Sequence, residues 1–464
     1  MADYRLVIIG GGLSGLAAAI RYARYFPDVL VLEQHIRAGG LNSYYYRQGR
    51  LFETGLHAIT NFAPPEDKNA PLNRLLRQLK IKREQLALHP QIRSEIRFFD
   101  RYTLSFSNDF AELTECIRKE FPQALPGFLR FYQNLPEIDP FTPSPFRSAR
   151  QFLQSHIDDP VLVDMLLCPL LFYGSSMEND MDLSQFAIMF RAIFLEGLCR
   201  PMGTIKDLLD MLLAHYLSLG GAIRYQAKVA KIIHGNQQAN GLLLENGETI
   251  NCDAIISTVG YRETLSLLGH QLPEDEKRIG FVETIFQFPV ENAVDFPHDI
   301  TNIFYNNSSP FKYAAPKNIV DMNSGVLCFP MNFAGNRLAE TGNGPQLRIT
   351  HLANYQLWAD MAKDQEAYQR EKFRISHQSF IEAEKILGQL PKNPAYEDMF
   401  TPVTIARFTS KHAGAVYGSA KKIKDGNIGF KNLYLAGTDQ GLLGIVGSMI
   451  SGVSIINRYI LPKL

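Results

Sequence analysis

The sequence lacks net charge, a long apolar run and a targeting segment. Its 464 residues hold 47 Lys and Arg against 47 Asp and Glu, so the formal net charge is zero. Nucleic-acid-binding proteins usually carry an excess of basic residues, so we expect no nucleic-acid partner. No stretch of 18 apolar residues occurs, and residues 6–9 lack the basic flank and cleavage site of a signal peptide. We therefore expect the chain to begin with its own first strand.

Cysteine is also scarce, and its spacing excludes two further classes. The five cysteines are scattered singly, at Cys116, Cys168, Cys199, Cys252 and Cys328. Zinc sites and disulfide frameworks need closely spaced or paired cysteines, and the zinc-protease motif H-E-x-x-H is absent too. We expect no metal and no disulfide, and a reducing, cytoplasmic location. At roughly 150 residues per domain, the length predicts two to three domains.

The N-terminal segment carries the first positive signal. An apolar run at residues 5–9 predicts a strand, and the residues after position 15 predict a helix. Between them stands G-x-G-x-x-G, in which the glycines permit a tight turn, close approach of a pyrophosphate and close helix packing, while the helix start offers free N–H groups. The predicted contacts are Gly10, Gly12, Leu13, Ser14 and Gly15.

An acidic residue follows at the distance that this motif requires. Glu33 lies 18 residues after Gly15 and ends a second uniformly apolar run at residues 29–32. A carboxylate in this place accepts hydrogen bonds from the hydroxyls of an adenosine ribose. The segment from 4 to 33 therefore predicts a βαβ dinucleotide-binding unit.

A second glycine pair indicates which dinucleotide is bound. Residues 37–43 read R-A-G-G-L-N-S, and residues 52–57 read F-E-T-G-L-H. This resembles the nucleotide-binding region of the FAD-dependent amine-oxidase superfamily, in particular its phytoene-dehydrogenase and carotenoid-isomerase branch. Leu41 stands where a basic or polar residue is common in that family. The resemblance implies FAD as the cofactor, with contacts from Gln34, Arg37, Gly39, Gly40, Leu41 and Asn42.

Later segments extend the resemblance to the end of the chain. Residues 201–260 are similar to the family's P-x-G, helix, G-G and strand series, and residues 401–402 with 414–418 to a segment of phytoene-dehydrogenase-like proteins. Residues 432–452 are similar to the terminal FAD motif, although the acid of that motif comes one position late here. The implied cofactor residues are Val229, Thr258, Gly260, Gly437, Thr438, Asp439, Gly444 and Ile445.

These segments predict an α/β protein with two interleaved domains. A Rossmann-like FAD-binding domain would comprise residues 1–65, 201–265 and 425–464, and a mixed α+β substrate domain residues 66–200 and 266–424. Within the latter we predict strands at 282–288 and 325–329 and a long polar helix over about 346–387. Asn246-Gly247 predicts a hairpin turn.

The substrate expected from the resemblance is an apolar isoprenoid or polyene, either desaturated or isomerised between cis and trans by hydride exchange. The chain has 30 Phe and 20 Tyr but one Trp, and apolar stretches at 161–173 and 186–194. These residues either line a hydrophobic tunnel or form the ordinary core of a helical domain. Oxidation of an amine or of a protoporphyrinogen-type tetrapyrrole stays open. So does a non-enzymatic prenyl-lipid escort, although the intact glycine motifs and Glu33 disfavour it.

One side chain is a candidate for proton transfer, and one helix for membrane contact. His57, two residues after Gly55, either moves a proton near the flavin or is structural, and His412 is a weaker candidate. The basic amphipathic segment 72–83 either docks on an anionic membrane surface or covers the core. The sequence leaves the oligomeric state open.

Overall fold

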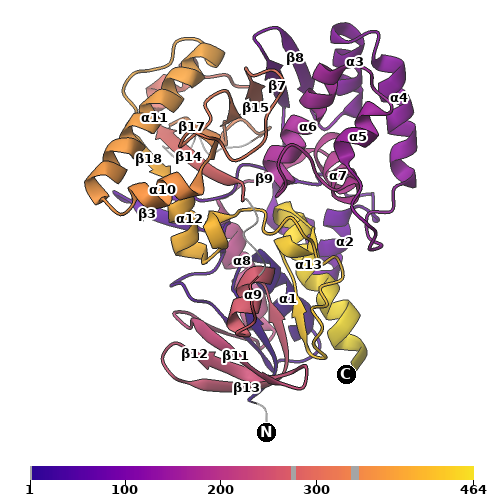
Figure 1. Cartoon of the computed structure of the whole chain (residues 1–464), viewed down its shortest axis with the longest axis vertical. Coiled ribbons are helices and arrows are strands. Elements are labelled where there is room, and N and C mark those ends of the chain that lie inside the picture. Colours follow the sequence, from indigo (N-terminus) through magenta and orange to yellow (C-terminus); the bar gives the residue numbers. More distant parts are fainter. Residues whose placement is uncertain (1–2, 273–277, 336–343, 464) are drawn as a thin grey trace.

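Two seven-stranded sheets organise the chain. The computed structural model describes residues 3–272, 278–335 and 344–463. The first sheet lies at the lower end of the molecule with both chain termini, and the second lies at the upper end between two groups of helices (Figure 1). The functional site is built where elements of these two halves meet.

The first sheet has a parallel centre that is buried on both faces. Its middle strand β1 (Tyr4–Ile9) pairs with β2 (Val29–Leu32) and β13 (Thr249–Ser257), and every residue of β2 is buried. Such uniform burial explains the continuous apolar runs in the sequence. Two further parallel strands complete the centre, namely β10 (Ala222–Arg224) on β2 and β19 (Leu433–Leu435) on β13.

A hairpin extends this sheet on one side. Strand β11 (Val229–Gly235) pairs antiparallel with β12 (Gln238–Leu244), which pairs in turn with β13. The turn between β12 and β13 contains Gly247 at a φ of 87°, a conformation that glycine adopts without strain. The hairpin predicted at Asn246-Gly247 is therefore confirmed.

Three helices cover the parallel strands and pack closely. They are α1 (Leu13–Ala23), α8 (Ile205–Ser218) and α13 (Gly444–Ile455). A Cβ atom at Gly452 of α13 would lie 2.0 Å from the carbonyl oxygen of Ser14 in α1, so only glycine permits this contact. The helical stretch Gly444–Lys463 is long and apolar enough to span a membrane, yet half of its most apolar window is buried inside the protein.

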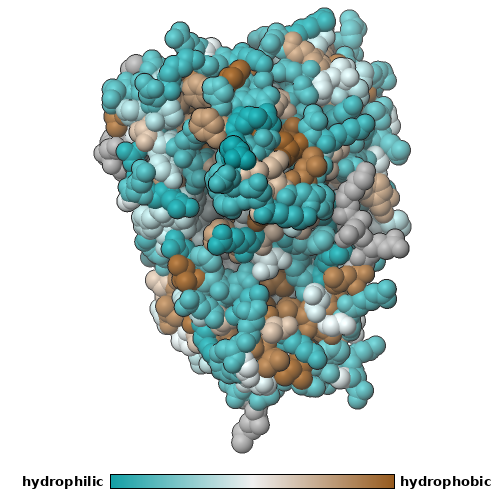
Figure 2. All heavy atoms as spheres, turned by 60° about the vertical axis from the view of Figure 1, so that its left-hand side comes forward, coloured by the Kyte–Doolittle hydropathy of each residue, from teal (hydrophilic) through white to brown (hydrophobic). Residues whose placement is uncertain are grey.

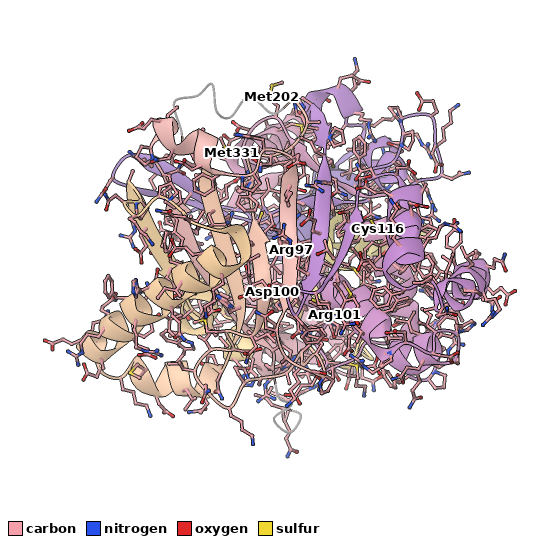
Figure 3. The ribbon with its side chains drawn as sticks, turned by 90° about the horizontal axis from the view of Figure 1, so that it is seen from above. Arg97, Asp100, Arg101, Cys116, Met202 and Met331 are labelled. Atoms are coloured by element: carbon pink, nitrogen blue, oxygen red, sulfur yellow. The ribbon has the colours of Figure 1, made fainter. Side chains whose placement is uncertain are left out.

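The second sheet is mostly antiparallel and lies between two helical layers. Its strands, in spatial order, are β18 (Tyr396–Phe400), β14 (Gly280–Gln287), β17 (Gln346–Ala353), β16 (Ser324–Cys328), β15 (Ile300–Asn306), β7 (Arg93–Phe98) and β8 (Tyr102–Phe106). Seen from above, Arg97 lies on the sheet and Cys116 lies on α3, on the helical side (Figure 3). The α/β fold with a Rossmann-like part and a mixed α+β part is thus observed.

Each face of the second sheet has its own helices. Helix α11 (Gln365–Leu387), preceded by α10 (Tyr355–Met361), packs on one face through Phe380 and Ala383. The opposite face joins the largest core of the molecule, which holds the remaining helices of this half. They are α3 (Phe110–Glu120), α4 (Leu125–Asn134), α5 (Ala149–Gln154), α6 (Pro160–Gly174) and α7 (Leu183–Phe190).

Short elements join the two halves. Strands β3 (Tyr44–Arg47) and β4 (Arg50–Glu53) form a hairpin, and β9 (Leu198–Pro201) pairs with β5 (Ile59–Thr60) and β6 (Leu88–Pro90). Helices α9 (Tyr261–Leu267) and α12 (Pro402–Thr409) lie beside the first sheet and the second, respectively. All strands of the first sheet fall in the three segments predicted for the FAD-binding domain, whereas the domain boundaries themselves stay a prediction.

The helix predicted over 346–387 is wrong in its first part. Residues 346–353 form β17, a central strand between β14 and β16, and helix begins only at Tyr355. Leu347 and Ile349 pack toward α11, while the neighbouring Arg348 is fully buried and paired with a carboxylate. Residues 346–350 do alternate polar and apolar side chains, which is the pattern of a strand, and the helix prediction overlooked it.

Two apolar features turn out to be core. Helix α2 spans only Pro71–Leu79, and its four leucines are buried in the core beneath α1 and α13, so its apolar face is not available to a membrane. Stretches 161–173 and 186–194 lie mainly in α6 and α7, whose side chains fill the largest core. Of these two stretches, only Phe172 and Tyr173 also line the cavity of the candidate site, which is described below.

Candidate functional site

The glycine-rich turn after β1 leads directly into α1, whose first N–H groups have no carbonyl partner within the helix. A Cβ atom at Gly15 would lie 2.0 Å from the carbonyl oxygen of Gly10, so this position admits glycine alone. At Gly12 the nearest atom to such a Cβ is 4.0 Å away, which leaves open space on that side of the turn. No side chain caps α1, and its first turn has no acidic residue. The turn can therefore bind an anion such as a pyrophosphate.

Glu33 lies at the end of β2 with its carboxylate held by the backbone. One oxygen accepts from the N–H of Gly11 at 2.8 Å, and the other accepts from the N–H of His35 at 2.8 Å. Burial raises the pKa of Glu33, and these backbone donors partly oppose that shift. The carboxylate is thus fixed beside the glycine turn, where it can accept from a ribose.

Other predicted residues converge on the same turn. Gly39 forms a parallel bridge with Gly12, the Thr258 hydroxyl donates to the carbonyl of Ile9 at 2.9 Å, and a Cβ at Gly437 would lie 3.9 Å from the side chain of Ser14. Segments from three parts of the chain therefore meet at one end of the parallel strands, as in other dinucleotide sites. The buried Ser14 hydroxyl has no hydrogen-bond partner within the described residues, as expected of a group that awaits a polar ligand.

Asp439, one of the predicted cofactor residues, makes its hydrogen bonds within the protein. The Asp439 carboxylate accepts from the N–H groups of Tyr261 and Ser419, each at 2.6 Å. Burial alone would raise its pKa, but Lys411 and Lys422 lower it below the ordinary value. This side chain therefore joins the segments that carry Tyr261 and Ser419.

A cavity of about 590 Å³ extends from the cofactor region into the second half of the molecule. Predicted residues on its wall are Glu33, Arg37, Gly40, Leu41, Asn42, His57, Gly444 and Ile445. The other predicted residues do not line this cavity: Gly10, Gly12, Leu13, Ser14, Gly15, Gln34, Gly39, Val229, Thr258, Gly260, Gly437, Thr438 and Asp439. The glycine turn, its open side and the unpartnered Ser14 hydroxyl fit a bound dinucleotide.

The far part of the cavity has an aromatic wall. It comprises Phe172, Tyr173, Phe281 and Tyr417. The hydroxyl of Tyr417 donates to the carbonyl of Phe172 at 2.6 Å, and that of Tyr173 donates to Asn302 Oδ1 at 3.0 Å. Burial raises the pKa of both phenols, so they stay uncharged. With their hydroxyls bound to protein acceptors, these rings leave mainly hydrocarbon for the cavity.

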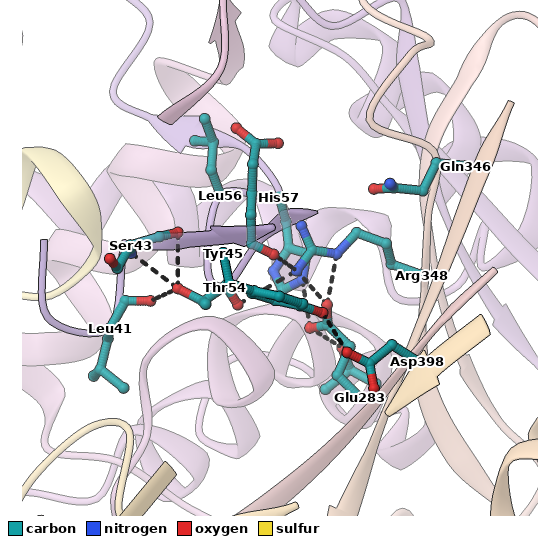
Figure 4. Close-up of polar contacts among 12 residues, drawn as sticks. Leu41, Ser43, Tyr45, Thr54, Leu56, His57, Glu283, Gln346, Arg348 and Asp398 are labelled. Atoms are coloured by element: carbon teal, nitrogen blue, oxygen red, sulfur yellow. Dashed lines mark hydrogen bonds and ion pairs between the residues drawn. The ribbon is translucent and has the colours of Figure 1, made fainter. Parts of the chain in front are cut away.

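His57 is held by a buried ion pair at the cavity wall (Figure 4). Its Nε2 lies 2.7 Å from Glu283 Oε2, while the other oxygen of Glu283 accepts from Arg348 Nε at 2.5 Å. Arg348 also donates to the carbonyl of Glu53 at 3.0 Å. Burial alone would raise the pKa of Glu283, but Arg348 and His57 lower it below the ordinary value. The carboxylate is therefore ionised and fixes the orientation of the imidazole.

Sequence reasoning missed Glu283 and Arg348. They lie on the adjacent strands β14 and β17, and the helix predicted over 346–387 placed Arg348 in the wrong element. The signal that could have found Glu283 is a lone charge within the apolar run of β14, whose residues are all buried. A buried carboxylate needs a cation nearby, but the sequence does not say which one.

Fold and site together define a protein that binds a dinucleotide, and comparisons with known proteins identify its class. Residues 13–283 match the model of the family described as flavin containing amine oxidoreductase. Because this match covers more than half of the chain, the protein belongs to that family. It is an FAD-dependent, phytoene desaturase-like oxidoreductase.

Curated relatives extend the similarity at low identity. The chain is 23% identical to a prolycopene isomerase of Daucus carota, over 96% of this chain and 74% of the relative. It is 26% identical to a lycopene-forming phytoene desaturase of Pseudescherichia vulneris, over 60% of each chain. An all-trans-retinol 13,14-reductase of Danio rerio is 20% identical over 98% of this chain and 86% of the relative.

Solved structures agree on the fold. An oxidoreductase from Methanosarcina mazei superposes with a TM-score of 0.69 at 16% identity, covering 98% of this chain and all of the other. A putative protoporphyrinogen oxidase from Exiguobacterium gives a TM-score of 0.61 at 16% identity, with both chains covered completely. At these identities the superpositions establish the α/β architecture and no substrate.

Proposed function

We propose that this oxidoreductase acts on an apolar isoprenoid or polyene, which it desaturates or isomerises between cis and trans. One observation carries the proposal: the aromatic wall of Phe172, Tyr173, Phe281 and Tyr417 leaves mainly hydrocarbon toward the cavity, because its hydroxyls are bound to protein acceptors. An apolar chain is stabilised when it leaves water and packs against such a wall, whereas a polar substrate would lose hydrogen bonds to water there. The carotenoid relatives support the same substrate class.

The protein's own share of the reaction is to hold the chain, exclude water and position one proton-binding group. When bound, FAD supplies hydride acceptance and donation. The side chain of His57 lies on the cavity wall, fixed through Nε2 by Glu283, so the rest of its ring can hold or accept a proton beside the substrate. Desaturation and isomerisation share this arrangement, and both stay within the proposal.

The His57 cluster disfavours an amine substrate. A protonated amine is usually held by a carboxylate, and Glu283 on the cavity wall is already paired with His57 and Arg348. An amine would be a third partner for a carboxylate whose charge Arg348 already compensates. An amine in this part of the cavity would therefore be poorly bound.

We also propose that the protein is cytoplasmic and takes such a substrate from a membrane. Helix α2 is not the docking element, because its leucines are buried. The face shown in Figure 2 is mostly hydrophilic, with apolar residues in small separate patches. Flotation with anionic liposomes tests peripheral contact. Arg74→Glu/Arg77→Glu should float as the wild type does, and absence of the wild type from the lipid fraction would remove membrane contact from the proposal.

The substrate class is tested by two anaerobic assays on the FAD-loaded protein. In the first, bleaching of the flavin absorbance is followed with phytoene, putrescine and protoporphyrinogen, and we expect phytoene alone to bleach it if the enzyme desaturates. In the second, the reduced enzyme is incubated with a poly-cis carotene, and an isomerase would yield the trans product without net reoxidation of the flavin. Bleaching by putrescine or protoporphyrinogen, with no response to either polyene, would overturn the proposal.

A further inference from the structure

Two basic side chains on the cavity wall have no acidic partner. Lys372 comes from α11 and Arg47 from the end of β3, and both line the cavity. Within the described ranges, neither side chain makes a hydrogen bond or an ion pair. The closest defined contact of Lys372 is its Nζ atom, 5.9 Å from the ring centre of Tyr368. By contrast, Arg37 on the same wall donates to the carbonyl of Tyr44 at 2.8 Å.

One carboxylate lies near these cations, and it is already engaged. Asp398 on β18 accepts a hydrogen bond from the hydroxyl of Tyr45 at 2.8 Å, a contact visible in Figure 4. Burial lowers the pKa of Lys372, Asp398 raises it and Arg47 lowers it, so the three charges act on one another. With two positive charges against one negative, this end of the cavity has a surplus of one positive charge.

Lys372 is partly buried, whereas Arg47 is exposed at the end of β3. A partly buried cation without a counterion is costly, so an anion that binds beside Lys372 relieves that cost, and Arg47 adds a second donor to the same anion. The surplus matches the single charge of a carboxylate, whereas a phosphate monoester carries about 1.5 to 2 negative charges at neutral pH. The same cavity has its aromatic wall at Phe172 and Tyr417. The arrangement therefore offers a place for a hydrocarbon chain and a place for an acidic end group.

We propose that Lys372 and Arg47 form an anion subsite that binds the carboxylate end group of an apolar polyene acid. The inference rests on the proposed function, since it adds an end group to the apolar substrate. The two residues determine specificity and take no part in the redox step. An acid should bind more tightly than the uncharged ester or alcohol of the same chain.

The test uses cis-parinaric acid, a fluorescent tetraene fatty acid, and its methyl ester as probes of the FAD-loaded protein. The acid should bind the wild type about tenfold more tightly than the ester, the effect of one charge-assisted hydrogen bond. Lys372→Gln and Arg47→Gln should each weaken binding of the acid about tenfold and leave the ester unchanged. Lys385→Gln, on the same helix but paired with Glu382 at its exposed end, is the control and should change neither.

Each other outcome has a definite meaning. If the wild type binds acid and ester equally, the subsite is wrong while the apolar substrate class survives. If neither probe binds, the proposed function itself fails. If Lys372→Gln or Arg47→Gln loses the flavin absorbance, these cations serve the cofactor and the subsite is overturned.

Discussion

The two sheets contribute to the site by different means. The parallel sheet acts through its backbone: the turn at Gly10 and Gly12, the uncapped start of α1 and a carboxylate held by two N–H groups. The mixed sheet acts through side chains that project from the faces of its strands, chiefly Glu283 and Arg348. The cofactor can therefore be held by backbone geometry, whereas the substrate meets side chains.

Because of this difference, mutations in the two sheets should have different consequences. Changes in the parallel sheet should act by steric exclusion and abolish cofactor loading. Changes in the mixed sheet should act through unpaired charges or lost apolar contacts, and should alter stability or substrate binding while FAD stays bound. The predictions below test this division, from the largest effect to the smallest.

The largest effect is expected for Gly15→Val. The new Cβ would lie 2.0 Å from the carbonyl oxygen of Gly10, so the turn must open and the N–H groups lose their alignment. We expect purified Gly15→Val to show no flavin absorbance, even after incubation with excess FAD. Gly235→Ala in β11 is the control, because no atom lies within 4 Å of the added Cβ. Normal loading of Gly15→Val would contradict the role of the backbone.

Next in size is the loss of the buried ion pair in Arg348→Met. Glu283 would lose its buried cation and keep only His57 as a partner, which should lower the free energy of unfolding by about 3 kcal/mol. Thermal unfolding followed by circular dichroism measures the change. The double variant Arg348→Met/Glu283→Met should recover much of the loss, because it buries no unpaired charge. If both variants were equally unstable, packing at these positions would matter more than charge.

The same division explains which parts of the protein were predictable. Gly10, Gly12 and Gly15 are recognisable because the turn permits one residue type at fixed spacing, and Glu33 because it must follow β2. The parallel strands were recognisable because a strand buried on both faces has a continuous apolar sequence. Such rules depend only on residues that are close in the chain, so they can be applied to the sequence alone.

In the mixed sheet, the apolar runs of β14 and β16 predicted strands at 282–288 and 325–329, but the charged residues of the site follow no local rule of this kind. Arg348 is an ordinary helix former in isolation, and only its pairing with Glu283, 65 residues away in the sequence, explains its burial in a strand. Lys372 and Arg47 are likewise brought to one cavity by elements more than 300 residues apart in the chain. Tertiary contacts decide these positions, so their roles emerged only from the structure.

A smaller effect is predicted at Tyr417, where ring and hydroxyl can be separated. Tyr417→Phe keeps the aromatic face and loses the hydrogen bond to Phe172, so the Kd for parinaric methyl ester should change less than threefold. Tyr417→Ala removes the ring, and the lost apolar contact should weaken binding of the ester roughly tenfold or more. Fluorescence titration of the FAD-loaded variants measures both. Equal losses in the two variants would mean that the hydroxyl contacts the ligand, which contradicts an apolar wall.

The smallest effect concerns pH, because the two buried carboxylates have pKa shifts of opposite sign. The pKa of Glu283 is lowered by Arg348 and His57 against the effect of burial, so its stabilisation is complete above the ordinary glutamate pKa and is lost as pH falls through the lowered value. The pKa of Glu33 is raised by burial, so its ionised form opposes folding above the raised value, and acidification relieves that cost.

Thermal unfolding of the cofactor-free protein across the acidic range separates the two contributions. On acidification, the stability advantage of the wild type over Glu283→Gln should shrink, whereas the wild type should gain relative to Glu33→Gln. If both stability differences changed in the same direction on acidification, the contrast between the two sheets would be wrong. The backbone donors at Glu33 and the buried cation at Glu283 would then stabilise a carboxylate to the same extent.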